Sequence, residues 1–192
     1  MSDEENATSP SDHLAAVGLV ATAWAMFEFQ IDFSSLQLGK IPQSAGVCLT
    51  AQVIGPGRKL DAYIAIARLR GANKFMEELD KFARNAIQIG ERRNRVVHDA
   101  WYLTGRSVPK RLEITARRIL KAGFVESGTQ QLIDLAVEIH DISNRFQDIH
   151  KRVMASIDAW PCKFLSNYPG EKAGQEVYIW PANATLFLRL EI

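Results

Sequence analysis

The segment from Glu91 to Trp101 contains side chains that proteins use to bind and act on phosphate esters. Three arginines, an asparagine and a histidine fall within seven residues: Arg92, Arg93, Arg95, Asn94 and His98. An arginine guanidinium binds a phosphate through two parallel N–H donors, and an imidazole exchanges a proton near neutral pH. The composition of this segment therefore indicates a site for a phosphate-bearing ligand.

The geometry of these residues depends on the element that carries them. On a helix, Asn94 and His98 lie one turn apart on the same face, whereas Arg93 is about 140° from His98. Arg93 and His98 could then meet only through the long arginine side chain, at a helix start, or across two subunits. No helix end exists here if the preceding helix runs through Gly90, but if a new helix starts after Gly90, the arginines lie in its first turns. Cations are unfavourable there by about 0.3 to 1 kcal/mol each, and a bound anion would reverse this effect.

The charge of the chain is unevenly distributed. The 192 residues contain 23 Lys and Arg against 22 Asp and Glu, and a net charge of +1 excludes a protein that binds polyanions over its whole surface. From Glu91 to Lys121, however, nine Lys and Arg stand against three acids, an excess of six positive charges that leaves −5 for the rest. Arg117 and Arg118 belong to this basic segment. They could contact a nucleic-acid backbone or form a solvated face.

The elements that position this segment are predicted to be mainly helical. Apolar residues recur three and four apart, which is typical of helices. They predict helices over about residues 11–31, 45–54, 60–69 and 74–89. The first helix is apolar on most sides, so we expect it to be surrounded by other elements. Glu28 lies within it, either solvated at an exposed edge, which is the commoner case, or half-buried in support of the site.

The most regular pattern lies in the last third of the chain. Seven apolar residues alternate at spacings of three and four: Leu132, Leu135, Ile139, Ile142, Phe146, Ile149 and Val153. This heptad seam predicts a long helix over 128–157, preceded by a capping box at Ser127 and Gln130. The seam could pack against neighbouring helices or join two copies of the chain. His140 and His150 each follow a seam residue, and we expect both to be partly solvated.

Short alternating runs predict a small amount of β-structure. Residues 101–103 and 111–115 predict a hairpin inserted near 101–116. The tail contains two further alternating runs, over 175–180 and 186–192. We therefore expect a mainly α fold, a helical bundle with a long heptad-patterned helix and a small antiparallel β annex. Its parts would be a disordered lead (1–10), a helical domain (11–157) and a C-terminal β annex packed on the same domain (158–192).

Other features of the sequence exclude several classes of protein. The cysteines, Cys48 and Cys162, lie far apart and match no metal-binding spacing, so we expect no disulfide framework, no metal centre and no cofactor. Acidic residues occur in the first dozen positions, where a secretory signal would be basic. The apolar stretch 14–27 is shorter than the roughly 18 to 20 residues that a membrane span needs. We therefore expect a cytoplasmic protein that does not enter the membrane.

The basic segment also resembles a known family signature. Arg93-Asn94-x-x-x-His98 is similar to the Arg-x(4–6)-His motif of the HEPN superfamily, compact α-helical proteins of which many are metal-independent endoribonucleases. The resemblance covers about residues 11–157. It implies an endoribonuclease that cleaves single-stranded RNA through the 2′-hydroxyl and leaves 2′,3′-cyclic phosphate ends. It also implies a homodimer, and it is compatible with a toxin or defence role in which an antitoxin or regulatory protein is a further partner.

The resemblance assigns roles to the matching positions. His98 would be the general acid or base that handles the proton of the ribose 2′-hydroxyl. Arg93 would bind the scissile phosphate and Asn94 would orient the phosphate or the imidazole, while Arg92 fits the arginine spacing equally well. Four phosphate- or RNA-binding arginines and two supporting residues complete the expected site: Arg92, Arg95, Arg117, Arg118, Glu28 and Trp101. In this family, two copies of the motif across a dimer commonly form one site.

Three other interpretations stay open. One is a catalytically inactive module of the same fold that binds RNA or a nucleotide, or only dimerises. The second is an HD-type metal phosphohydrolase, because His98-Asp99 and His140-Asp141 are both His-Asp pairs; Asp158 would then have to be the last ligand. The third is that the arginines and His98 form only a solvated surface cluster, with His98 hydrogen-bonded to Asp99 at a helix end.

Overall fold

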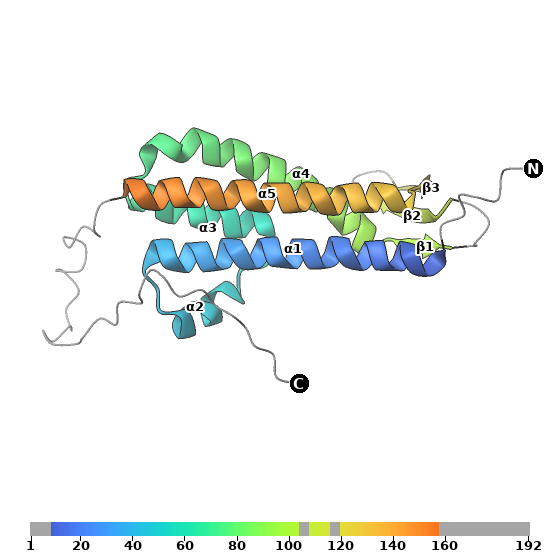
Figure 1. Cartoon of the computed structure of the whole chain (residues 1–192), viewed down its shortest axis with the longest axis horizontal. Coiled ribbons are helices and arrows are strands. Elements are labelled where there is room, and N and C mark those ends of the chain that lie inside the picture. The colour runs from blue at the N-terminus through green and yellow to red at the C-terminus, as the bar shows by residue number, and fades with distance from the viewer. Residues whose placement is uncertain (1–8, 104–107, 116–119, 158–192) are drawn as a thin grey trace, which may run out of the picture. The chain divides into compact units, whose positions relative to one another are not determined.

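The computed structural model of the chain describes residues 9–103, 108–115 and 120–157 (Figure 1). The described residues lie in the first of two compact units, Met1–Ala159. Its elements are, in chain order, α1 (Pro10–Gly39), α2 (Gln43–Thr50), α3 (Pro56–Leu69), a 3₁₀ turn η1 (Asn73–Phe75), α4 (Met76–His98), β1 (Ala100–Tyr102), β2 (Lys110–Thr115), β3 (Lys121–Glu126) and α5 (Thr129–Ser156). The prediction of a mainly helical fold with a small antiparallel sheet is confirmed. The predicted annex, 158–192, and most of the predicted lead lie outside the described residues.

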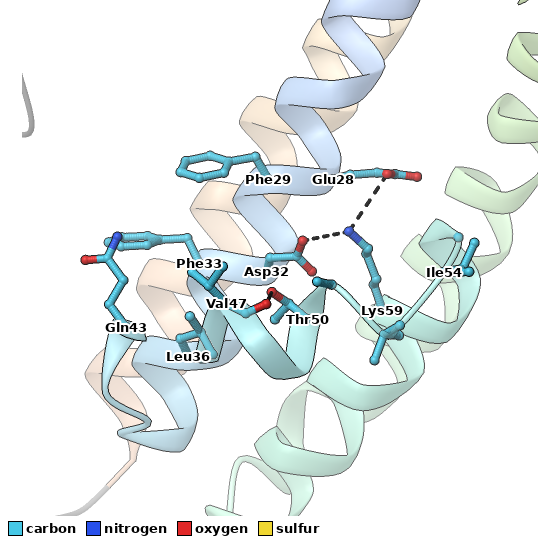
Figure 2. A pocket seen from close by; sticks show the side chains of 13 residues that line it. Glu28, Phe29, Asp32, Phe33, Leu36, Gln43, Val47, Thr50, Ile54 and Lys59 are labelled. Carbon is cyan, nitrogen blue, oxygen red and sulfur yellow. Dashed lines mark hydrogen bonds and ion pairs between the residues drawn. The ribbon is translucent and has the colours of Figure 1, made fainter. Parts of the chain in front are cut away.

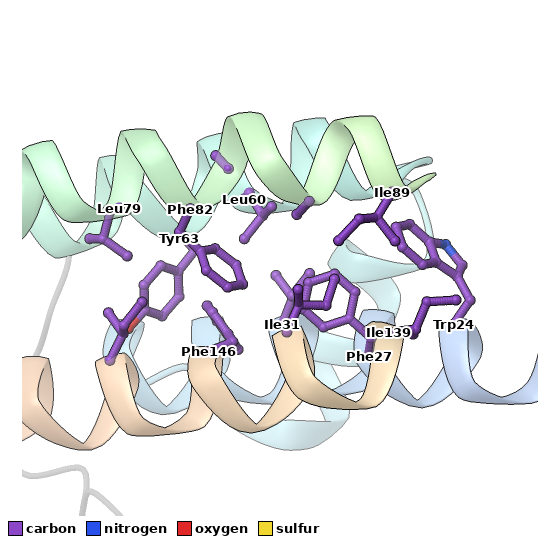
Figure 3. Packing of buried hydrophobic residues seen from close by; sticks show 14 of the residues in the cluster. Trp24, Phe27, Ile31, Leu60, Tyr63, Leu79, Phe82, Ile89, Ile139 and Phe146 are labelled. Atoms are coloured by element: carbon purple, nitrogen blue, oxygen red, sulfur yellow. The ribbon is translucent and has the colours of Figure 1, made fainter. Parts of the chain in front are cut away.

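The core of the unit is an aromatic cluster to which each of the four long helices contributes one ring. Phe27 of α1 makes edge contacts with Phe82 of α4 and Phe146 of α5, both at 6.2 Å between ring centroids. Tyr63 of α3 packs against Phe146 at 5.0 Å (Figure 3). Edge-to-face aromatic pairs add about 0.5 to 1.5 kcal/mol each beyond the burial of their area. This cluster therefore holds α1, α3, α4 and α5 around one core.

The heptad seam is used entirely within this core. The predicted long helix is confirmed as α5, and all seven seam residues are buried. α5 runs alongside α1 in the same direction (Figure 1), because His13 bonds to Thr129 near the start of both helices and Gln37 bonds to His150 near their ends. Of the two possibilities left open by the sequence, the seam packs against neighbouring helices and does not present an apolar surface to a second copy.

The N-terminus of α5 differs by one residue from its prediction. The backbone N–H of Gly128 donates to Gln131 Oε1 at 3.2 Å, so the cap lies at Gly128 and not at Ser127. Glycine has no side chain to complete a capping box, and the Gln131 side chain alone satisfies the free donor at this end.

α4 continues through Gly90, so the prediction that a helix ends there is wrong. The Trp24 ring of α1 lies against Gly90: a Cβ on residue 90 would be 2.9 Å from Trp24 Cη2 and 3.0 Å from Trp24 Cζ2. Glycine is needed here for the close approach of two helices, and it does not interrupt α4. The arginines and His98 consequently lie in the last turns of α4 and not in the first turns of a new helix.

The sheet has one strand more than predicted. β1 pairs with β2 in antiparallel register, with Trp101 opposite Arg111, which confirms the predicted hairpin. β3 adds to the other edge of β2, with Leu112 opposite Phe124. All residues of β3 are exposed, so this strand lacks the alternation of buried and exposed residues that would have identified it from sequence.

His150 is buried, contrary to the prediction that it is partly solvated, whereas His140 is exposed. His150 Nδ1 lies 3.0 Å from the Tyr63 hydroxyl, and His150 Nε2 lies 3.0 Å from Gln37 Oε1. Gln37 Oε1 can only accept, so Nε2 carries the proton and Nδ1 accepts from Tyr63. Burial lowers the pKa of His150 to about 4 and raises the pKa of Tyr63 above its usual range. Both side chains are therefore neutral at pH 7.

Among the described helices, α1 is long and apolar enough to cross a membrane by length and composition. Its most apolar 18-residue window has a mean hydropathy of 1.6. Of this window, 28% is buried in the structure, including Phe27 and Trp24, which the inner side of α1 supplies to the core.

Replacing Gly90 tests the contact between α1 and α4. The Gly90→Val variant should lose about 2 kcal/mol of free energy of unfolding in urea denaturation, because a buried Trp24 ring has nowhere to move. Ala65→Val introduces the same side chain at an exposed position of α3 and should cost no more than about 0.7 kcal/mol. Equal losses in the two variants would contradict a tight contact.

Acidification tests the burial of His150. The unfolded chain has the ordinary histidine pKa of 6.5 and the folded chain a pKa of about 4, so below pH 6.5 the unfolded state takes up a proton that the folded state does not. The stability linked to neutral His150 is complete above pH 6.5 and lost as the pH falls to 4, by at most about 3 kcal/mol. The free energy of unfolding of His150→Gln should vary less over this range than that of the unmodified protein. His140→Gln is the control and should vary as the unmodified protein does.

Candidate phosphate-binding site

Arg93, Asn94 and His98 lie in the last turns of α4, and a hydrogen bond joins the first two. Arg93 Nη1 donates to Asn94 Oδ1 at 3.0 Å, so the arginine side chain bends around the helix towards the face that Asn94 shares with His98. Asn94 and His98 are exposed, and His98 is the last residue of α4. Arg93 and His98 are about 140° apart around the helix. The long arginine side chain reduces this separation within one chain, because it reaches Asn94.

The free donors of Arg93 distinguish it from its neighbours. Among the described residues, no carboxylate lies within ion-pair distance of Arg93, and its Nε is buried without a hydrogen-bond partner. Arg92, by contrast, forms a hydrogen-bonded ion pair with Glu138 of α5. Of the two arginines that fit the spacing, Arg93 is the one that no carboxylate of the described residues pairs with.

The electrostatic argument from a helix start fails here. The group lies at the C-terminal end of α4, where the helix dipole is negative and cations are favourable. The arginines therefore need no bound anion to stabilise the helix end. Any affinity for phosphate must come from the side chains themselves.

Arg95 has a structural role and is not free to bind RNA. Its Nη1 donates to the carbonyl of Ile114 at 3.1 Å and lies 3.5 Å from Asp99 Oδ1, and its Nε lies 4.0 Å from Glu113 Oε1. Arg111 of β2 completes the group at 2.8 Å from Asp99 Oδ2 and 3.2 Å from Glu113 Oε2. We call Arg95, Asp99, Arg111 and Glu113 the hairpin charge cluster. It attaches β2 to the end of α4, and neither Arg111 nor Glu113 had been singled out from the sequence.

Trp101 anchors the segment as expected. Its indole N–H donates to the carbonyl of Val96 at 2.8 Å, and its ring makes an edge contact with His13 at 4.5 Å between centroids. His13 is itself buried and bonded to Thr129, and burial lowers the pKa of its imidazole. Trp101 therefore joins the end of α4 to the starts of α1 and α5.

Glu28 belongs to a different part of the surface. It accepts from the Trp24 indole at 3.0 Å and lies 3.8 Å from Lys59, which also pairs with Asp32 at 2.6 Å. These groups line one end of a shallow groove of about 450 Å³ between α1, α2 and the start of α3 (Figure 2). The described structure records no bond between Glu28 and the α4 group, and the two are related only through Trp24, which lies against Gly90.

The other predicted residues contribute less than expected. Arg117 and Arg118 lie outside the described residues. Within the described residues, no group of three or more His, Cys, Asp or Glu side chains is placed to hold a metal ion. His140 and Asp141 are exposed on α5, while Asp158 and Cys162 lie outside the described residues.

The excess positive charge of the basic segment, 91–121, is partly neutralised by Glu138, which pairs with Arg92, and by Glu126, which pairs with Lys110 at 2.9 Å.

Comparison with known proteins does not assign the chain to a family. No protein-family model matches the chain, and neither the curated proteins nor the solved structures contain a match.

Substitutions can compare the hairpin charge cluster with the exposed ion pair between Arg92 and Glu138. Asp99→Ala removes the carboxylate closest to Arg111, whose side chain is largely buried. The substitution should therefore lower the free energy of unfolding by about 2 to 3 kcal/mol. Glu138→Ala breaks the exposed pair with Arg92 and should cost less than about 1 kcal/mol. Thermal or urea denaturation of both variants provides the comparison. If Asp99→Ala were as stable as Glu138→Ala, the structural role assigned to the hairpin charge cluster would be wrong.

Proposed function

We propose that the end of α4 is the active site of a metal-independent endoribonuclease that acts on single-stranded RNA. The observation that supports this function is the state of Arg93: its donors are not used by a carboxylate of the described residues, and its bond to Asn94 holds it on the side of α4 that carries His98. Arg92 and Arg95, in contrast, are held by carboxylates. The group therefore provides one phosphate ligand and one imidazole on an exposed surface that a flexible RNA strand can reach.

The proposed reaction is an internal transfer of the phosphodiester. His98 in its neutral form accepts the proton of the ribose 2′-hydroxyl, and the 2′-oxygen attacks the adjacent phosphorus. The bond between phosphorus and the 5′-oxygen breaks, which leaves a 2′,3′-cyclic phosphate on one fragment. The departing 5′-oxygen takes a proton from water, or from the second copy of the motif that the HEPN resemblance implies. No oxidant, metal ion or cofactor is needed for this balance.

The arginine and the asparagine would assist by charge and orientation. Arg93 can donate two N–H groups to the non-bridging oxygens of the phosphate and stabilise the negative charge that develops there. Asn94 would hold Arg93 or the phosphate at the level of the imidazole. The hairpin charge cluster and Trp101 act indirectly, because they fix the end of α4 to the sheet and to α1.

Cleavage of a single-stranded RNA in EDTA tests this function. The unmodified protein should produce fragments with 2′,3′-cyclic phosphate ends, and His98→Ala should lower the rate by at least about 100-fold. Arg93→Gln should lower it by a similar factor, whereas Arg92→Gln, whose arginine is already paired, should change it by less than about threefold.

His140→Ala removes an exposed histidine of α5 and is the matched control, with an unchanged rate expected. RNA that is bound but not cut would favour the inactive binding module. Cleavage that requires added Mn²⁺ would favour an HD-type phosphohydrolase. Full activity of His98→Ala would rule out the proposed site.

A further inference from the structure

One side of α1 is exposed and apolar along most of its length. Five large side chains on this side are between 38% and 55% exposed: Leu14, Leu19, Met26, Phe29 and Phe33. No Asp, Glu, Lys or Arg occurs between Asp12 and Glu28. The opposite side of α1 is buried in the core. Between Asp12 and Glu28, α1 is therefore apolar on most sides, whereas the described residues cover mainly one of them.

A helix of this kind is normally buried on every side. The exposed parts of the five large side chains amount to on the order of 500 Å², at the upper end of what a monomeric protein leaves in water. Val47, which lines the groove near Phe33 (Figure 2), brings the apolar area closer to the roughly 800 Å² per partner of a stable interface. This side of α1 is large enough to form the core of a protein contact.

The sizes of the residues on this side change along the helix. Smaller residues lie in the N-terminal half: Ser11, Ala15, Gly18, Thr22 and Ala25. Larger residues lie mainly in the C-terminal half, with Leu14 at the edge: Leu19, Met26, Phe29 and Phe33. At 100° per residue all of them fall on one face. An antiparallel second copy centred on Thr22 would bring Phe29 to the level of Ala15 and Met26 to the level of Gly18, so that these two large side chains meet small residues.

From these features we infer that this side of α1, which we call the outer face of α1, binds the same face of a second copy of the chain in an antiparallel arrangement. Such a contact is isologous and closes at two subunits. α2 covers Leu36 and so bounds the face at its C-terminal end, where Gly46 packs on Leu36. In the antiparallel arrangement, Pro10 at the N-terminus of the second α1 lies at the level of Ser34 of the first. The second α1 therefore does not reach α2.

Gly18 supports this arrangement independently. A Cβ on residue 18 would have no atom within 4 Å, so nothing in the described part of the chain requires glycine there. Glycine in the interior of a helix is less favourable than alanine by about 1 kcal/mol. A Met26 side chain from the second copy gives a physical reason for a residue without a side chain at this position.

The charges at the edges of the outer face favour a protein over a membrane. The edge residues of α1 are Asp12, Glu28 and Asp32, of which the last two pair with Lys59, whereas helices that lie on membranes carry several Lys and Arg beside their apolar face. Asp12 and Asp32 stand about 160° apart around the helix, so an antiparallel partner does not bring them together. A second copy therefore meets no opposed like charges.

This contact is independent of the proposed ribonuclease. Trp24, which lies against Gly90 of α4, is roughly opposite to Phe29 and Met26 on α1. The outer face is thus turned away from α4, and pairing of two outer faces would not bring the two Arg93–His98 groups together. Failure of one proposal leaves the other intact.

Sedimentation equilibrium of the full chain tests the inference. The unmodified protein should be a dimer, and both Gly18→Leu and Met26→Glu should raise its dissociation constant by at least about tenfold. Ala62→Leu on α3 and Met154→Glu on α5 make the same changes at other exposed positions and should leave the dimer unchanged. Circular dichroism of each variant verifies its helical content.

Disulfide trapping in a chain with Cys48 and Cys162 replaced by serine tests the orientation. Thr22→Cys should cross-link to itself on oxidation, and Ala15→Cys should not, because antiparallel copies hold residues 15 about 20 Å apart. Cross-linking of both variants would show a parallel contact and overturn the antiparallel assignment. A monomeric protein, a dimer that both face substitutions leave intact, or binding of monomers to phosphatidylcholine vesicles through Met26 would overturn the inference itself.

Discussion

The contact between the Trp24 ring and Gly90 is the constraint on which the position of the candidate site depends. Because residue 90 has no side chain, α1 lies directly against the backbone of α4, and the Trp24 indole remains free to donate to Glu28. α4 passes through this point without a break and ends at His98. The basic segment is consequently the last part of a helix that the core already fixes.

The basic segment separates into structural and available cations. Arg95 and Arg111 share the carboxylates of Asp99 and Glu113, and they attach the sheet to the end of α4. Their mutual pairing stabilises the fold and removes them from any RNA-binding surface. Arg93 is left with Asn94 as its hydrogen-bond partner in the described structure. Among the described arginines of the basic segment, Arg92, Arg95 and Arg111 are therefore paired with carboxylates, and Arg93 is not.

Periodicity predicted the parts of the fold that depend on local pattern. α5 was predictable from the spacing of its buried residues, and the pairing of β1 with β2 from the alternation of Leu112 and Ile114 with polar neighbours. The role of Gly90 was not predictable, because it depends on Trp24, which is 66 positions earlier in the chain. The same is true of the candidate site: the motif identified Arg93 and His98, but the choice of Arg93 over Arg92 depends on Glu138, 46 residues further on.

Nuclear magnetic resonance of the histidine rings during titration with a single-stranded DNA oligonucleotide tests the central claim most directly. This ligand carries the phosphate chain but lacks the 2′-hydroxyl, so it can bind at the end of α4 without being cut. The ring signals of His98 should shift in a saturable manner, those of His140 on α5 should stay in place, and Arg93→Gln should abolish the shift at His98. Unchanged His98 signals at saturating oligonucleotide, or shifts that persist in Arg93→Gln, would contradict the account.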